Sequence, residues 1–128
     1  MELAEIIAFW KKSARLDKKT CESLFKTKNY VACLFFLHLY LEKTLKGIVQ
    51  KKTGKTPPFT HDLLVLTKIA NIDLTDEQQR DLAVINTFNI RARYADFKFS
   101  LYKKATKAFT TKFCKIGEEL YKWFSKLN

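Results

Sequence analysis

Tyr-Val-Ala-Cys-Leu-Phe-Phe-Leu-His-Leu-Tyr-Leu, residues 30–41, is the stretch of sequence that decides the fold. It is apolar nearly all round, whereas a helix at the surface of a protein keeps a polar face. Such a helix needs cover on all sides, and we expect the other helices of this 128-residue chain to cover one side only. The uncovered side predicts a homodimer through the apolar face of residues 30–41.

The helix that precedes this stretch follows from the spacing of its apolar residues. Residues 2–26 carry an apolar stripe with alternating steps of four and three, which predicts an amphipathic helix. Asp17 falls on this stripe, and a buried carboxylate is costly unless it is paired. We therefore expect Asp17 to meet a cation or a hydrogen-bond donor from another helix.

The central helix itself is expected to begin after Asn29, a good capping residue, and to end near Lys52. Residues 53–59, with one Gly and two Pro, form the one clear loop. A short helix is expected from about residue 62 to residue 70, capped by Thr60 or Asp62.

The last part of the chain predicts two more long helices. Thr75-Asp76-Glu77-Gln78 fits a capping box that opens a helix reaching to about Arg93. Segment 94–100 interrupts the apolar pattern, and a final helix is expected from Tyr102 to Leu127. The sequence thus predicts an all-α, up-and-down helical bundle of four long helices plus one short helix, in a single domain over residues 1–128.

Composition and charge exclude some functional classes and favour others. Apolar residues make up 47% of the chain, and only three Gly and two Pro occur, which argues against disorder and against an all-β fold. The net charge of +11 favours anionic partners such as nucleic acid, nucleotides or an acidic protein. The alternative is a solvated Lys-rich surface, because no run of lysines is longer than two.

The three cysteines and the N-terminus indicate the compartment. Cys21, Cys33 and Cys114 lie in apolar helical stretches without CxxC spacing, so we expect reduced core residues of a cytoplasmic protein and no zinc site. The N-terminus is acidic and lacks the apolar region of a signal peptide. The longest apolar stretch is too short to cross a membrane, so we expect no membrane role. No cofactor is expected either.

The two histidines invite different interpretations. His38 and Glu42 are spaced to share a metal ion, but no third His exists, and we expect a satisfied core or interface histidine instead. His61 lies beside Asp62 where a helix begins, and free N–H groups at such a place favour anions. His61 therefore either packs the loop over the central helix, binds a phosphate or transfers a proton.

Arg91, Arg93 and Tyr94 close the fourth predicted helix. Two residues separated by one position point about 200° apart on a helix, so one arginine at most enters the bundle. That arginine needs a carboxylate such as Asp17 or Glu42, while the other could face a phosphate. Tyr94 could stack on a base or cover the end of the bundle. No glycine-rich phosphate-binding loop is present.

The order of these features resembles the HEPN family over about residues 8–98. The matching segments are Trp10 and Asp17, Asn29-Tyr30, Phe35 to Lys46, Thr60 to Leu66, and Asn89 to Tyr94. The resemblance implies an up-and-down helical bundle that is usually homodimeric. HEPN domains are often fused to, or encoded beside, minimal nucleotidyltransferases, frequently as toxin–antitoxin pairs, and others act as RNases or nucleotide-binding modules.

The nuclease branch of the family carries an Arg followed, four to six residues later, by a His at the dimer interface. Neither Arg91 nor Arg93 has such a His, and neither of the other two arginines does. The resemblance therefore implies a non-catalytic module that binds a nucleotide or other phosphate and pairs with a nucleotidyltransferase. The expected ligand-binding residues are Lys43, Lys46, His61, Arg91, Arg93 and Tyr94.

Two alternatives stay open. One is a metal-independent RNase or RNA-binding toxin in which His61 or His38 replaces the missing motif histidine. The other is a purely structural protein-interaction module.

Overall fold

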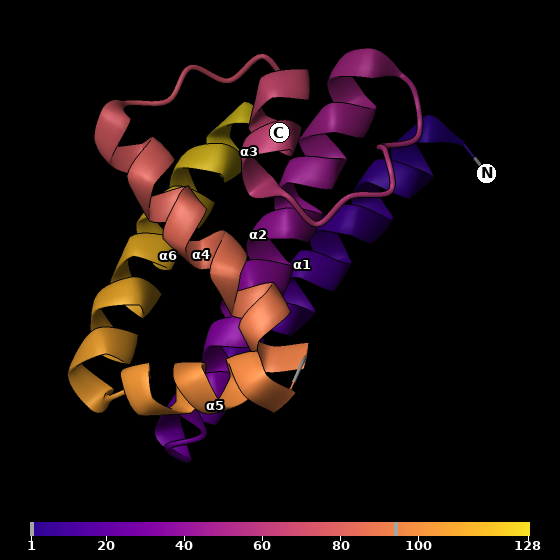
Figure 1. Ribbon diagram of the computed structural model, residues 1–128. Helices are drawn as coiled ribbons and strands as arrows, with labels where there is room; N and C mark the ends of the chain where they lie inside the picture. Colours follow the sequence, from indigo (N-terminus) through magenta and orange to yellow (C-terminus); the bar gives the residue numbers. More distant parts are fainter. Residues whose placement is uncertain (1, 94) are drawn as a thin grey trace.

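The computed structural model describes residues 2–93 and 95–128, and all their side chains except those of residues 90–93 and 95–98. Over this part of the chain the fold is an all-α bundle, as the sequence predicts (Figure 1). The helices are α1 (Leu3–Lys26), α2 (Tyr30–Thr53), α3 (Leu63–Ile69), α4 (Asp76–Arg93), α5 (Ala95–Lys104) and α6 (Lys107–Leu127).

Helix α2 is the centre of the bundle. It forms a long hairpin with α1, and α3, α4, α5 and α6 also contact it (Figure 1). Six of residues 30–41 are buried, and the other six are half-buried. The half-buried residues, among them Val31, Phe35 and Leu39, lie four positions apart on one face of the helix, so the chain covers the opposite side more completely. The homodimer through residues 30–41 stays a prediction.

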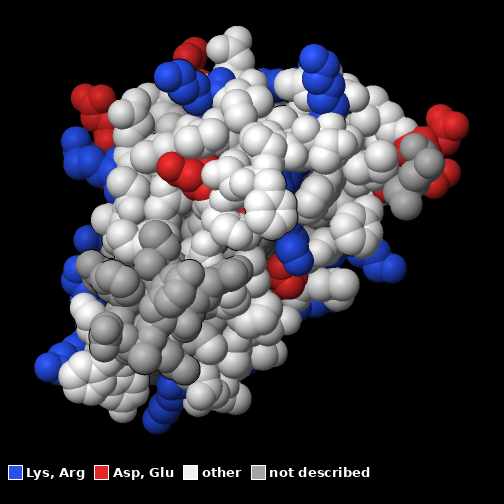
Figure 2. Space-filling model, turned by 45° about the vertical axis from the view of Figure 1, so that its right-hand side comes forward, with Lys and Arg blue, Asp and Glu red and all other residues white. Residues whose placement is uncertain are grey.

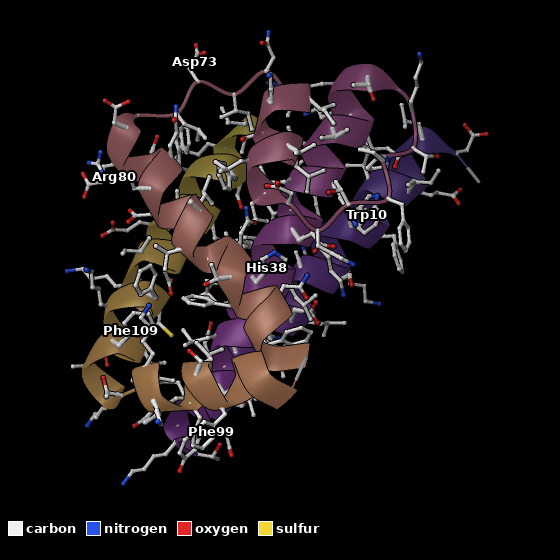
Figure 3. All side chains as sticks on the ribbon, viewed as in Figure 1. Trp10, His38, Asp73, Arg80, Phe99 and Phe109 are labelled. Atoms are coloured by element: carbon white, nitrogen blue, oxygen red, sulfur yellow. The ribbon has the colours of Figure 1, made fainter. Side chains whose placement is uncertain are left out.

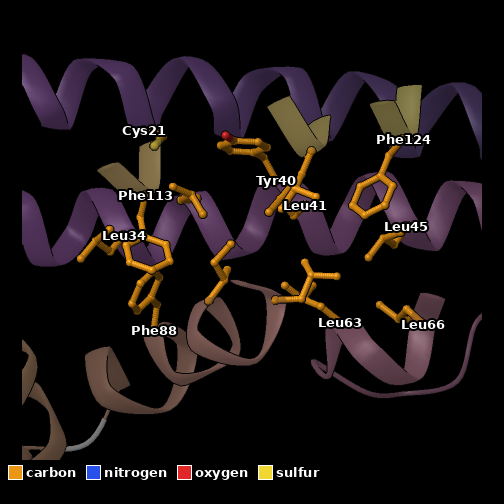
Figure 4. Close-up of a cluster of buried hydrophobic side chains, with 14 of the residues drawn as sticks. Cys21, Leu34, Tyr40, Leu41, Leu45, Leu63, Leu66, Phe88, Phe113 and Phe124 are labelled. Carbon is orange, nitrogen blue, oxygen red and sulfur yellow. The ribbon is translucent and has the colours of Figure 1, made fainter. Parts of the chain in front are cut away.

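The largest buried side chains lie where α2 meets α4 and α6 (Figure 4). Phe88 of α4 and Phe113 of α6 make a T-shaped contact with ring centroids 5.4 Å apart. Gly117 lets α6 approach α2 closely, because a Cβ atom there would lie 2.8 Å from Tyr40 Oη and 3.0 Å from Leu37 Cγ. Both neighbours are buried, so neither has room to move.

We expect Gly117→Ala to lower the free energy of unfolding by about 1–2 kcal/mol in urea denaturation, because overpacking outweighs the better helix propensity of alanine. Tyr40→Phe removes the nearest atom, so the same substitution should cost less in that background. Lys115→Ala on the exposed face of α6 is the control. A Gly117→Ala protein as stable as the parent would contradict this account of the close approach.

Two of the expected helix caps are confirmed. Asp62 Oδ1 accepts hydrogen bonds from Leu64 N at 2.9 Å and Val65 N at 3.4 Å. In the capping box, Gln78 N donates to Thr75 Oγ1 and Thr75 N donates to Gln78 Oε1. Helix α2 begins after Asn29 as expected, but the Asn29 side chain donates to Thr27 Oγ1 instead of capping the helix.

The region after α4 differs from the expectation of five helices. The interrupted apolar pattern marks a change of direction between α4 and a further helix, α5, which crosses the end of the bundle (Figure 1). The final helix begins later than Tyr102, since Thr106 caps it by accepting a hydrogen bond from Phe109 N. Among residues 2–93 and 95–128, no helix combines the length and the apolarity that crossing a membrane requires.

The three cysteines meet inside the bundle in the reduced state. Hydrogen bonds from Cys21 and then Cys33 lower the pKa of the Cys114 thiol to about 4. The contact with Cys114 is also the main reason why the pKa of Cys33 rises to about 12 and that of Cys21 rises as well. These opposite shifts make Cys114 the expected nucleophile of the cluster.

In reduced, chelator-treated protein we expect iodoacetamide to modify Cys114 first, with a rate that falls less steeply between about pH 8 and 6 than that of an ordinary cysteine, because Cys21 and Cys33 lower the pKa of its thiol. An ordinary cysteine slows roughly tenfold per pH unit below its pKa. Peptide mass mapping gives the site and the rate. In Cys21→Ala, one donor is lost and the steeper pH dependence should return; a normal cysteine profile in the parent protein would refute the assignment.

Candidate functional site

Glu42 is the centre of the most polar buried cluster among the described side chains. Its own side chain is 6% exposed. Oε2 accepts a hydrogen bond from Lys46 Nζ at 2.9 Å, while Oε1 lies 3.0 Å from His61 Nδ1 and 3.7 Å from His38 Nδ1. A buried carboxylate requires such partners, because burying it without them is strongly unfavourable. One carboxylate thus connects α2 to the loop that precedes α3.

The hydrogen-bond partners of the two histidines assign their protons. His38 Nε2 lies 2.8 Å from the carbonyl oxygen of His61, and a carbonyl only accepts, so His38 Nε2 carries a proton. By the same reasoning, His61 Nδ1 donates to the Glu42 carboxylate. The neutral His61 ring then has its lone pair on Nε2. Figure 3 shows His38 near the middle of the molecule, consistent with the core histidine that the sequence predicts.

His61 combines a fixed ring with access to solvent. Its side chain is 42% exposed, and its Nε2 has no hydrogen-bond partner among the side chains that the structure describes. Phe59, fully exposed, lies beside the ring with centroids 6.1 Å apart. The interpretation that His61 packs the loop over α2 is therefore confirmed. This packing leaves Nε2 available to a ligand.

Asn86 of α4 holds the same loop from the other side, and sequence reasoning missed it. Its Nδ2 donates to Asp62 Oδ1 at 2.8 Å, and its Oδ1 accepts from Leu63 N at 2.9 Å. The first N–H groups of α3 are thus occupied by Asp62 and Asn86. The expectation that free N–H groups beside His61 attract an anion is wrong.

The two lysines expected in the site are each paired with a carboxylate. Lys43 Nζ lies 2.7 Å from Asp17 Oδ2, which confirms that Asp17 meets a cation from another helix. Lys46 binds Glu42 and lies over the Trp10 ring, 5.9 Å from its centroid. Both carboxylates proposed as partners of a buried arginine are therefore occupied by lysines of α2. The structure brings Lys46 and His61 together on Glu42, whereas Lys43 belongs to the α1–α2 contact.

The other expected site residues fall outside the described side chains. Arg91 and Arg93 belong to the last turn of α4, but their side chains lie outside the described residues, and so does Tyr94 entirely. Over the described part of the face in Figure 2, basic side chains are spread out and interspersed with acidic ones. The charge of +11 is not gathered into one patch on that face.

The comparisons with known proteins fit this architecture. The profile of the HEPN domain family matches residues 7–127. The chain belongs to the HEPN family. The crystal structure of TT1696 from Thermus thermophilus resembles this HEPN domain with a TM-score of 0.80 and 15% sequence identity, over 95% of this chain and 98% of that one. This likeness concerns the fold alone, and a search of curated proteins finds no match.

The cluster in this HEPN domain has a defined chemical capacity. A carboxylate bound to one nitrogen of a histidine orients the ring, and the opposite nitrogen can then exchange a proton or bind an oxygen. Glu42 and His61 have this arrangement at 3.0 Å. The Asn86 and His38 contacts keep the loop, and hence the ring, in place.

We expect Glu42→Ala to lower the free energy of unfolding by about 3 kcal/mol, because Lys46 and His61 both lose the buried carboxylate with which they pair. Urea denaturation measures the change. Glu119→Ala removes an exposed carboxylate of α6 and should change the stability by less than about 0.5 kcal/mol. Equal stabilities of the two variants would show that Glu42 does not hold the loop.

Proposed function

We propose that this HEPN domain is a non-catalytic module that binds a nucleotide or other phosphate ligand, with His61 as a direct contact. The observation that supports the proposal is the Glu42–His61 pair, which engages Nδ1 and leaves Nε2 without a hydrogen-bond partner among the described side chains, in a ring that is 42% exposed. When His61 is protonated, Nε2 donates to a phosphate oxygen while Glu42 accepts from Nδ1. The net charge of +11 favours an anionic ligand.

Lys46 contributes to this site through Glu42, whose charge it balances. Lys43 contributes if a phosphate replaces Asp17 as its partner. Arg91, Arg93 and Tyr94 complete the proposed ligand-binding residues, on the grounds of the HEPN resemblance alone. The proposal includes a homodimer and a nucleotidyltransferase partner, as in a toxin–antitoxin pair, because HEPN domains commonly occur with such enzymes.

The test is a thermal-shift and calorimetry panel with ATP, AMP, pyrophosphate, inorganic phosphate and a short RNA. A ligand at about 100 times its Kd stabilises the folded protein by about 2.7 kcal/mol. We expect at least one phosphate compound to bind and His61→Ala to weaken it about tenfold or more. Lys122→Ala removes an exposed charge on α6 and should leave the affinity unchanged.

An affinity that is unchanged in both His61→Ala and Arg93→Ala would overturn the proposed site. The absence of a shift with every compound would instead favour the purely structural interaction module. A co-purification assay with a minimal nucleotidyltransferase encoded beside the domain tests the partner separately, since pairing does not require the phosphate site.

The second candidate is a metal-independent RNase, favoured by the same pair of residues. His61 Nε2, oriented by Glu42, could take a proton from a ribose 2′-hydroxyl that attacks the adjacent phosphate. Incubation with RNA in the presence of a chelator separates the two candidates. Cleavage that is lost in His61→Ala and slowed in Glu42→Gln would replace the binding module with the enzyme, whereas intact RNA supports the binding module.

A further inference from the structure

Three cysteines from three different helices bring their sulfur atoms together. Cys21 of α1, Cys33 of α2 and Cys114 of α6 have their Sγ atoms within 4.8 Å of one another. Cys33 Sγ lies 3.6 Å from Cys21 Sγ and 3.6 Å from Cys114 Sγ. Figure 4 shows Cys21 on the inner side of α1, facing the core between α1 and α2.

The cluster lies at the wall of a cavity of about 300 Å³ that Cys21 and Cys114 help to line. The rest of the wall carries two lysines, two glutamates and two aromatic rings: Lys18, Glu22, Phe25, Lys26, Tyr40 and Glu118. Glu22 and Glu118 both bind Lys18, at 2.8 and 3.4 Å. Cys21 and Cys114 are thus accessible from the cavity, while Cys33 is fully buried in the core.

We propose that Cys21, Cys33 and Cys114 form a binding site for one soft metal cation of the Zn²⁺ and Cd²⁺ class. A metal–thiolate bond of about 2.3 Å with tetrahedral angles places the sulfur atoms roughly 3.8 Å apart. Two of the three observed separations, at 3.6 Å, are close to this value, and the third is within 4.8 Å, so the ion requires only small shifts of the side chains. Thiolate ligands select soft cations over Mg²⁺ and Ca²⁺.

The fourth coordination position of this site faces the cavity. Among the described residues no fourth His, Cys, Asp or Glu joins the three sulfur atoms, which makes the site open, with room for water or another small ligand. Three thiolates and a divalent cation carry a net charge of −1. The two lysines and two glutamates of the cavity wall balance each other, so Lys26, which is not paired with either glutamate, is the cation of that wall left to meet the charge.

A metal site explains the arrangement better than a disulfide. A disulfide joins two sulfur atoms at about 2.05 Å, leaves the third cysteine unused and requires an oxidant. Cys33 is equally distant from both partners, so the geometry selects no pair. A single cation uses all three sulfur atoms, and its binding only releases thiol protons to water.

The test is a titration of the reduced full chain with Cd²⁺ under anaerobic conditions, after treatment with a chelator. We expect an ultraviolet sulfur-to-cadmium charge-transfer band that saturates at one equivalent per chain and that added Zn²⁺ displaces. Because the cation binds the folded state, it should also raise the Tm. Cys114→Ala should weaken binding at least tenfold, and Glu119→Gln, an exposed change on the same helix, should not.

A second measurement needs no variant and so does not depend on whether Cys114→Ala folds. One equivalent of Cd²⁺ should protect all three cysteines from iodoacetamide together. Alkylation that proceeds equally with and without Cd²⁺, or the absence of the charge-transfer band, would overturn the proposal. Rapid loss of two thiols in air with no metal binding before it would assign the cluster to disulfide chemistry instead.

Discussion

The burial of α2 is the constraint on which the rest of the structure depends. A helix that is apolar nearly all round gains its stability only when every side is removed from water. All of the other helices contact α2, and the absence of a side chain at Gly117 lets α6 pack closely against it. The bundle is therefore arranged around one helix, in contrast to four equivalent ones.

Burying this helix also determines where its polar groups go. Glu42 lies on the same helix, so its carboxylate is carried out of water with the apolar residues and requires donors nearby. Lys46, one turn further on, supplies the first, and His61 supplies the second from the loop before α3. The orientation of His61 thus results from the hydrogen bond that the buried Glu42 carboxylate requires. Because Nδ1 makes this bond, Nε2 is the nitrogen left for a ligand.

Features of the fold that depend on residues close together in the sequence were predictable. Contacts between residues far apart in the sequence were not. Local patterns gave the capping box at Thr75 and the cap at Asp62, and the stripe on α1 indicated correctly that Asp17 needs a cation. No local pattern could identify Lys43 as that cation, or place Asn86 against the loop, because these contacts join separate helices. The contact among Cys21, Cys33 and Cys114 could not be predicted either, because they lie on three different helices and their spacing in the sequence does not relate them.

The two polar clusters lie on opposite faces of α2. Cys33 and Glu42 are nine residues apart, and nine steps of about 100° bring them about 180° apart around the helix axis. The cysteines therefore face α1 and α6, while Glu42 faces the loop before α3. The two clusters share no residue, so a substitution in one removes no hydrogen bond or sulfur contact of the other. Experiments on the two proposed sites can therefore be interpreted separately.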